Sequence, residues 1–356
     1  MMSFLRWLGI VVWVVALSVL AADEKPDPGL SRLYPETGED LLGIHFTDAS
    51  TGWIVGRKGA LFLTADGGQT WIKPKAPFPK ADFHAVFFTD PDHGWIVGDT
   101  SDGPAVTERP LPNKPKTAAT ILRTSNGGKK WDRAWAMTNY PLTDFCVIGK
   151  DRVLAVSHSG GDKPDGDLYT SVVAATRWAG DRMFRGMNAI RFFDERTGCM
   201  AGTRVVITVF PKPNNPRYQE PKSRILRTTD GGATWKPIVH PDLPGGGEIL
   251  GLAVSGRTGW ACGTKGILLR TEDAGATWTA QTSAVTAALQ DVFAVDGKVA
   301  WAAGEGGTLL RTENGGETWV KVPTGETDQI NRVWFTSANR GIMVGAKGLV
   351  LRYEKK

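Results

Sequence analysis

Cysteine, histidine and tyrosine are scarce in this chain of 356 residues. Three cysteines, Cys146, Cys199 and Cys262, cannot form a disulfide framework, and we expect buried free thiols. The five histidines lack the spacing of zinc ligands, and no glycine-rich phosphate loop precedes a helix. The acidic stretch Gly160–Asp167 lacks the glutamate that completes a calcium loop. We therefore expect no metal and no cofactor.

Helical periodicity and long apolar runs are also missing, with one exception at the N-terminus. Arg6 precedes the apolar run Trp7–Leu20, small residues follow at Ala21 and Ala22, and the chain then turns polar. This pattern is typical of a secretory signal peptide, and the run is short for a membrane-spanning helix. We predict a signal peptide over residues 1–22 and export of residues 23–356, with membrane association only if the leader stays uncleaved.

The chain does have a repeated turn motif, Thr-x-Asp/Asn-Gly/Ala-Gly-x-x-Trp. The Asp or Asn side chain can close a tight turn on its own backbone, and glycine tolerates a positive φ. The tryptophan then buries a large ring at the start of the next strand. Each copy is therefore predicted to form the tip of a β-hairpin with its own packing ring. The five copies are Thr64–Trp71, Thr124–Trp131, Thr228–Trp235, Thr271–Trp278 and Thr312–Trp319.

The spacing of the motif indicates the architecture. Trp278 and Trp319 are 41 residues apart, and Trp235 and Trp278 are 43 residues apart. A period near 40 with strand-rich units is typical of a β-propeller with four antiparallel strands per blade. We predict one all-β domain, a seven-bladed propeller whose blades start near residues 41, 82, 143, 187, 248, 289 and 330. The last blade has only three strands before the chain ends, so residues 29–38 are predicted to supply its outer strand and close the ring.

Three insertions interrupt the repeat between the second and third strands of consecutive blades. They are Asp99–Ala119, Ser157–Asp167 and Thr208–Ser223, and strand parity places them on the face opposite the turn motifs. Proline makes two of them stiff, and long loops on a rigid scaffold commonly carry function. We predict that they form a partner-binding basic ridge with one aromatic anchor. Its residues are Arg109, Lys114, Lys116, Lys212, Arg217, Tyr218 and Lys222.

Arginine also recurs just before the turn motif, at Arg123, Arg227, Arg270, Arg311 and Arg352. One interpretation is structural, in which each arginine pairs with an acid of its own or a neighbouring blade, such as Glu272 or Glu313. The other is an arginine ring that binds an acidic peptide or a lipid head group. The net charge of +5, about +4 without the leader, permits an acidic partner without requiring one.

The turn motif also occurs in bacterial neuraminidases, so a glycan-cleaving or glycan-binding propeller is an alternative. A sialidase needs an arginine cluster, an acid and a tyrosine nucleophile. Tyrosine is scarce here, and the first predicted blade has no Arg-x-Pro signature. The motif itself marks the fold rather than an activity.

The full repeat at Gly52–Trp71, and with small departures at Gly259–Trp278, resembles the seven-bladed family of photosystem II stability and assembly factors and their relatives in non-photosynthetic bacteria. The resemblance extends over Leu41–Tyr353. It implies an exported, non-enzymatic scaffold that binds a protein partner and assists assembly of a membrane or envelope protein complex, with an acidic segment of a membrane protein as a candidate ligand. The expected protein is a monomer without nucleic acid, in the periplasm or outside the cell, or in the thylakoid lumen of a photosynthetic source.

Overall fold

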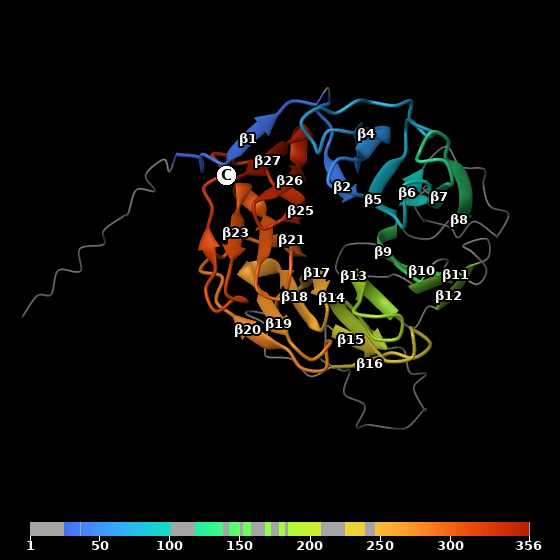
Figure 1. The fold of residues 1–356 in the computed structure, drawn as a ribbon. Helices are drawn as coiled ribbons and strands as arrows, with labels where there is room; N and C mark the ends of the chain where they lie inside the picture. Colours follow the sequence, from blue (N-terminus) through green and yellow to red (C-terminus); the bar gives the residue numbers. More distant parts are fainter. Residues whose placement is uncertain are drawn as a thin grey trace, which may run out of the picture.

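A computed structural model describes residues 25–35, 37–100, 118–137, 142–149, 152–157, 168–171, 178–181, 184–207, 225–238 and 246–355. Seven antiparallel sheets in these ranges are arranged as a ring around a central axis (Figure 1). Within each blade the strands follow one another in sequence order from the axis outward, except that the outer strand of the last blade comes from the N-terminus. The predicted seven-bladed all-β propeller is confirmed, and we number the blades by their innermost strands.

The innermost strands are β2 (Leu41–Phe46), β5 (Asp82–Phe88), β9 (Leu142–Ile148), β13 (Phe184–Phe192), β17 (Ile249–Ser255), β21 (Leu289–Ala294) and β25 (Ile330–Ser337). The second strands are β3 (Gly52–Gly56), β6 (Gly94–Thr100), β10 (Arg152–Ser157), β14 (Gly198–Ile207), β18 (Thr258–Gly263), β22 (Ala300–Gly304) and β26 (Arg340–Gly345). The third strands are β4 (Leu61–Thr64), β7 (Ala118–Thr124), β11 (Leu168–Ser171), β15 (Ile225–Thr228), β19 (Leu268–Thr271), β23 (Leu309–Thr312) and β27 (Val350–Glu354). The outer strands are β8 (Asp132–Met137), β12 (Trp178–Asp181), β16 (Lys236–Pro237), β20 (Thr279–Gln281), β24 (Val320–Lys321) and, in blade seven, β1 (Leu30–Leu33).

The ring is closed by β1, the N-terminal strand, which pairs antiparallel with β27 from Leu30↔Tyr353 to Leu33↔Val350. This pairing covers an edge that would otherwise present unpaired backbone groups. An ion pair between Arg32 Nη1 and Glu326 Oε2, 2.6 Å apart, holds the same strand. The closing strand predicted from the short last blade is therefore confirmed.

Blade one departs from the four-stranded pattern. Its sheet has three strands, and a single bridge between Leu63 and Ile72 marks where a fourth would run. In blade six the corresponding pairing continues because Val322 N–H donates to Leu309 O at 2.8 Å. Counting from the motif tryptophan, Pro74 stands at the position of Val322 and has no N–H to donate. The proline therefore ends the fourth strand after one bridge.

Apolar side chains fill the space between neighbouring blades. The cluster between blades six and seven includes Trp301, Phe335 and Tyr353, and the rings of Trp301 and Phe335 stack with centroids 4.3 Å apart. Four motif tryptophans, Trp131, Trp235, Trp278 and Trp319, are buried, and the fifth, Trp71, is half-buried. The five blades that carry the motif thus each contribute a large ring to a core shared with a neighbour.

The turn motif has the hydrogen bonds that its residues predict. In blade six, Gly316 N–H donates to Thr312 Oγ1 at 2.7 Å, and Thr318 N–H donates to Asn314 Oδ1 at 3.1 Å. Gly315 and Gly316 both have a positive φ, of 73° and 86°. Gly315 N–H also reaches Lys298 O at 2.8 Å, so the motif is tied to the turn between the first and second strands of its blade. The motifs and the turns between first and second strands therefore lie on one face of the ring, which we call the motif face.

Short 3₁₀ turns replace longer loops between the second and third strands of four blades. In three of them the central residue is a lysine in the left-handed region: Lys58, Lys265 and Lys347, with φ of 49°, 59° and 53°. The fourth has Gly306 at this position, with φ of 62°. Among the residues that the structure describes, no helix is long and apolar enough to cross a membrane.

Candidate functional site

The residues of the predicted basic ridge, Arg109, Lys114, Lys116, Lys212, Arg217, Tyr218 and Lys222, lie outside the described residues. The strands that flank the three insertions are described. They are β6 and β7, β10 and β11, and β14 and β15, which are in each case the second and third strands of a blade. The ridge itself stays a prediction.

The recurring arginines reach from one blade to the next. Arg227 Nε of blade four donates to Ala274 O in the turn motif of blade five at 2.8 Å. Arg270 Nη2 donates to Gly297 O of blade six, and Arg311 Nη2 to Ala338 O of blade seven, both at 3.3 Å. These contacts connect neighbouring blades on the motif face.

Acids and rings complete the surroundings of these arginines. Arg270 pairs with Glu272 at 2.8 Å and Arg311 with Glu313 at 2.6 Å, the two acids that the structural interpretation named. Arg311 also lies over the Trp301 ring, 5.1 Å from its centroid. Only 12% of the Arg311 side chain is exposed. The contacts favour the structural interpretation, while binding by an arginine ring stays a prediction.

Blade three lacks the turn motif and its arginine, and another residue makes a similar contact. Arg152, at the start of β10, donates Nη2 to Glu195 O of blade four at 3.5 Å. The connection between neighbouring blades is thus kept by a side chain from the second strand instead of the third.

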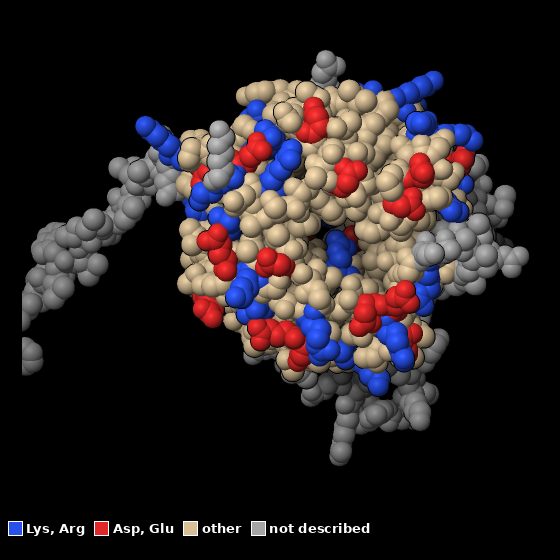
Figure 2. Space-filling model, viewed as in Figure 1, with Lys and Arg blue, Asp and Glu red and all other residues tan. Residues whose placement is uncertain are grey.

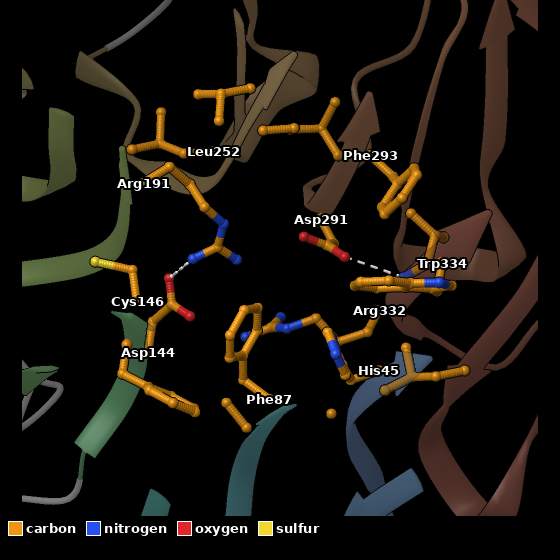
Figure 3. A pocket seen from close by; sticks show the side chains of 18 of the residues that line it. His45, Phe87, Asp144, Cys146, Arg191, Leu252, Asp291, Phe293, Arg332 and Trp334 are labelled. Atoms are coloured by element: carbon orange, nitrogen blue, oxygen red, sulfur yellow. Dashed lines mark hydrogen bonds and ion pairs between the residues drawn. The ribbon is translucent and has the colours of Figure 1, made fainter. Parts of the chain in front are cut away.

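A cavity of about 420 Å³ occupies the centre of the ring, and all seven innermost strands line it. Figure 2 shows a hollow at the centre of the molecule, with Lys or Arg atoms visible inside it. The pairing of each innermost strand with its second strand shows which positions are equivalent from blade to blade. Two such positions, which we call levels, hold the charged and aromatic residues of the lining. The upstream level holds Asp144, Asp291 and Arg332, and the level two residues downstream holds His45, Phe87, Arg191, Phe293 and Trp334 (Figure 3).

Aromatic side chains form one side of this cavity. Ring centroids are 5.1 Å apart for Phe293 and Trp334, 4.6 Å for Trp334 and His45, and 4.6 Å for His45 and Phe87. We call these four residues the aromatic arc. They come from the innermost strands of blades six, seven, one and two, so the arc is continuous around half of the cavity.

Charged groups from four blades face the same space. Arg191 Nη1 pairs with Asp144 Oδ2 at 2.5 Å, and this carboxylate also accepts Ile190 N–H at 3.0 Å. Asp291 Oδ2 accepts Val333 N–H at 3.0 Å. Each aspartate thus binds the backbone of the next blade, as expected for a buried carboxylate with a structural role.

Burial shifts the titration of several groups in the cavity. It raises the pKa of Asp291, against the positive charge of Arg332. It lowers the pKa of His45 to about 4, so this imidazole is neutral at pH 7. It also raises the pKa of the Cys146 thiol to about 12, which leaves that thiol unreactive.

Sequence reasoning missed this cavity because it followed the turn motifs, which lie at the rim. A signal was present in the innermost strands. Asp144, Arg191, Asp291 and Arg332 are charges within otherwise apolar runs, and a charge in a predicted core strand is informative. The three cysteines are buried free thiols, as expected. No cluster of metal-ligating side chains occurs within the described ranges.

Comparison with known proteins shows which family two segments of the chain resemble. Residues 31–101 and 279–354 match the family model described as "Photosynthesis system II assembly factor YCF48". The predicted family resemblance is confirmed over these residues, while the prediction had extended it over Leu41–Tyr353. The matched segments contain most of the closing strand β1 and all strands of blade one, blade six and the C-terminal part of blade seven, so the Ycf48-like part of the chain includes the point where the ring closes.

One curated relative is the photosystem II assembly protein Ycf48 of Thermosynechococcus vestitus. It is 36% identical over 75 residues, which are 19% of this chain and 21% of that protein. The chain therefore matches about a fifth of the length of this relative.

Solved structures share the fold over nearly the whole chain. YCF48 bound to a D1 peptide has a TM-score of 0.67 and 20% identity, covering 92% of this chain and 97% of that one. YCF48 from Cyanidioschyzon merolae has a TM-score of 0.64 and 18% identity, covering 91% and 98%. The GH74 enzyme of Niastella koreensis has a TM-score of 0.65 and 13% identity, covering 91% and 53%. At these identities the likeness concerns the fold alone.

Proposed function

We propose that this protein is an exported, non-enzymatic scaffold that binds a protein partner and assists the assembly or stability of a membrane or envelope protein complex. The observation that carries the proposal is the Ycf48 match at the closure of the ring. A structural neighbour with the same ring was solved with a bound D1 peptide. A closed ring whose blades are joined by side-chain contacts provides a rigid platform of the kind that such binding requires.

The partner-binding surface proposed here is the face that carries the connections between second and third strands. Three consecutive blades have their long insertions at these connections, and the predicted cations lie within them. Cations in exposed loops attract an acidic segment and raise its association rate. The contacts of Arg227, Arg270 and Arg311 with neighbouring blades support assigning these arginines to the fold instead.

The test begins with capture of a partner from envelope extract by the mature protein, residues 23–356, and its identification by crosslinking and mass spectrometry. The purified partner segment is then titrated against the wild type and a variant with Lys114, Lys116, Lys212 and Arg217 reversed to glutamate. We expect at least about a tenfold loss of affinity, equal to about 1.4 kcal/mol. The melting temperature should hardly change, because exposed loop charges contribute little to folding.

A matched control carries the same change of net charge at exposed positions outside the insertions. It reverses Lys129, Lys130, Lys236 and Lys298. Affinity should be nearly retained in this control. Equal losses in both variants, or retained binding in the loop variant at low as well as physiological salt, would contradict the ridge. Arg227→Ala and Arg270→Ala complete the test, since loss of capture with unchanged stability would move the site to the arginine ring.

The glycan alternative is tested on the same preparation. A catalytic propeller should gather acids and a tyrosine at the central opening. Asp144 and Asp291 do face the cavity, but each accepts a backbone N–H of the next blade, and the described lining residues include no tyrosine. We expect neither glycan binding nor hydrolysis. Release of reducing sugar that is lost in Asp291→Asn would overturn the non-enzymatic assignment.

A further inference from the structure

Two opposite charges in the central cavity, Asp291 and Arg332, form no ion pair, although each lies within the field of the other. Within the described part of the chain, no basic group lies within 4.0 Å of the Asp291 carboxylate, and no carboxylate lies within 4.0 Å of the Arg332 guanidinium. Asp291 accepts only the Val333 N–H, and Arg332 donates Nη1 to Asn331 O at 2.9 Å. Arg191 and Asp144, by contrast, pair with each other at 2.5 Å.

A third polar group in the cavity wall is also unsatisfied. Nδ1 of His45 has no hydrogen-bond partner among the described residues, and the residue is buried, with 5% of its surface exposed. Buried polar atoms in proteins are usually paired, and an unpaired one is free to bind a water or another small molecule. A neutral imidazole can offer such a molecule one hydrogen bond at this nitrogen.

The cavity has apolar space beside these groups. The aromatic arc forms one wall, and Ala253 of blade five contributes only a methyl group to the lining. A volume of about 420 Å³ is within the usual range for a small-molecule site. The space thus combines a cation and an anion that form no ion pair with a large aromatic surface.

We propose that the central cavity binds a free α-amino acid with an aromatic or branched apolar side chain. Arg332 binds the carboxylate, Asp291 binds the ammonium group, and the side chain packs on the aromatic arc. Both charge-assisted hydrogen bonds are strong in a site of low polarity. The ligand supplies an ion-pair partner at hydrogen-bond distance to the buried Asp291 carboxylate and to the half-buried Arg332 guanidinium, neither of which has one among the described residues.

Other small ligands match this arrangement less well. A neutral sugar can stack on the arc but leaves both charges uncompensated. An inorganic anion is attracted to Arg332, but the carboxylates of Asp291 and Asp144 in the same cavity repel it. A zwitterion has one group for each unpaired charge. The proposal does not depend on the protein partner, because the insertions and the cavity are different parts of the molecule.

The first experiment is calorimetry on the wild-type mature protein with L-phenylalanine and L-leucine. N-acetyl-L-phenylalanine lacks the ammonium group, L-phenylalanine amide lacks the carboxylate, and glucose lacks both. We expect the free amino acids to bind with a Kd below about 1 mM and each derivative to bind at least about tenfold more weakly. This series needs no variant, so it is independent of any effect on folding.

The second experiment repeats the titrations with Asp291→Asn, Arg332→Gln and the control Lys298→Gln. Lys298 is exposed in the turn between β21 and β22. Asparagine keeps an oxygen that accepts Val333 N–H, so the fold should be retained. Asp291→Asn should abolish the preference for L-phenylalanine over its N-acetyl derivative. Arg332→Gln should likewise abolish the preference over the amide, and Lys298→Gln should keep both.

Three results would overturn the proposal. The first is no binding of L-phenylalanine or L-leucine up to about 10 mM. The second is equal affinity of the wild type for the free and the N-acetylated amino acid. The third is a folded Asp291→Asn variant that still discriminates between those two ligands.

Discussion

Each buried motif tryptophan is expected to stabilise the fold by several kcal/mol. Trp278 and Trp319 are 4% and 8% exposed, and Trp319 Nε1 donates to Gln281 Oε1 of the preceding blade at 2.9 Å. Trp278→Ala and Trp319→Ala should each lower the free energy of unfolding by about 3–5 kcal/mol, as for other buried aromatic residues. Denaturant titration measures this. The neighbouring Val320 is 63% exposed, so Val320→Ala should stay within about 0.5 kcal/mol.

A loss below about 1 kcal/mol in both tryptophan variants would contradict the packing of these rings. The half-buried Trp71 gives an internal comparison. Its replacement by alanine should cost less than either of the other two, because it removes less buried surface.

The 3₁₀ turn of blade six isolates the energy of a left-handed residue. Gly306 has φ of 62°, and a Cβ built there would meet no atom within 4 Å. Gly306→Ala therefore adds backbone strain without a clash and should destabilise the protein by about 1 kcal/mol. Gly38 has equally open space and no positive φ, so Gly38→Ala should be neutral or slightly stabilising. Equal effects at both positions in thermal unfolding would disprove the strain argument.

At the scale of an element, β1 is the part whose loss should matter most. Deletion of residues 23–38 exposes the outer edge of β27 and removes Leu30 from the core beside Tyr353. We expect a melting temperature lower by at least about 2 °C, which corresponds to roughly 1 kcal/mol. Light scattering should show aggregation, because an open strand edge pairs with other chains.

Arg32→Ala is the matched control for this deletion. It removes the ion pair with Glu326 but leaves the strand in place, and the side chain is 35% exposed. A partly exposed pair contributes little, so the change in melting temperature should be small. An unchanged melting temperature and a monodisperse solution after the deletion would show that the ring does not need its closing strand.

At the scale of the whole molecule, the turn motifs around the ring should titrate together in acid. Hydrogen bonds from the Thr70 and Thr234 side chains lower the pKa of Asp66 and Asp230. At Asp273, burial acts in the opposite direction, but hydrogen bonds from Thr277 outweigh it and lower the pKa to about 2. The unfolded value is about 3.9, so this stabilisation is complete above that pH and is lost as pH falls from about 4 through 2.

Two motifs have asparagine instead, and Asn314 still accepts Thr318 N–H at 3.1 Å. The triple variant Asp66→Asn, Asp230→Asn, Asp273→Asn should therefore fold. Its stability should fall less steeply between about pH 4 and pH 2 than that of the wild type. An acid limb with the same slope in both proteins, measured by urea titration at each pH, would contradict the assignment.

Much of the architecture was predictable because the repeat acts locally. The turn motif specifies a hairpin through its own Thr, Asp and Gly, and its recurrence every 40 or so residues indicates blades. The short last blade predicted a closing strand, since an open edge is unfavourable. Pro74 was also visible in the sequence. Its effect, which is to end the fourth strand of blade one, depends on the bridge between Leu63 and Ile72 and on the hydrogen bond that Val322 makes at the equivalent position of blade six.

The central cavity was decided by the tertiary structure. Asp144, Arg191, Asp291 and Arg332 are far apart in the sequence, and no local rule says which of them will pair. Only the closed ring brings innermost strands of blades three, four, six and seven to one axis, where Arg191 pairs with Asp144 while Asp291 and Arg332 form no ion pair. The sequence by itself determined the blade, because hairpin turns and packing rings are local properties. The arrangement of charges around the axis depends on how seven blades meet, and that is a property of the whole ring.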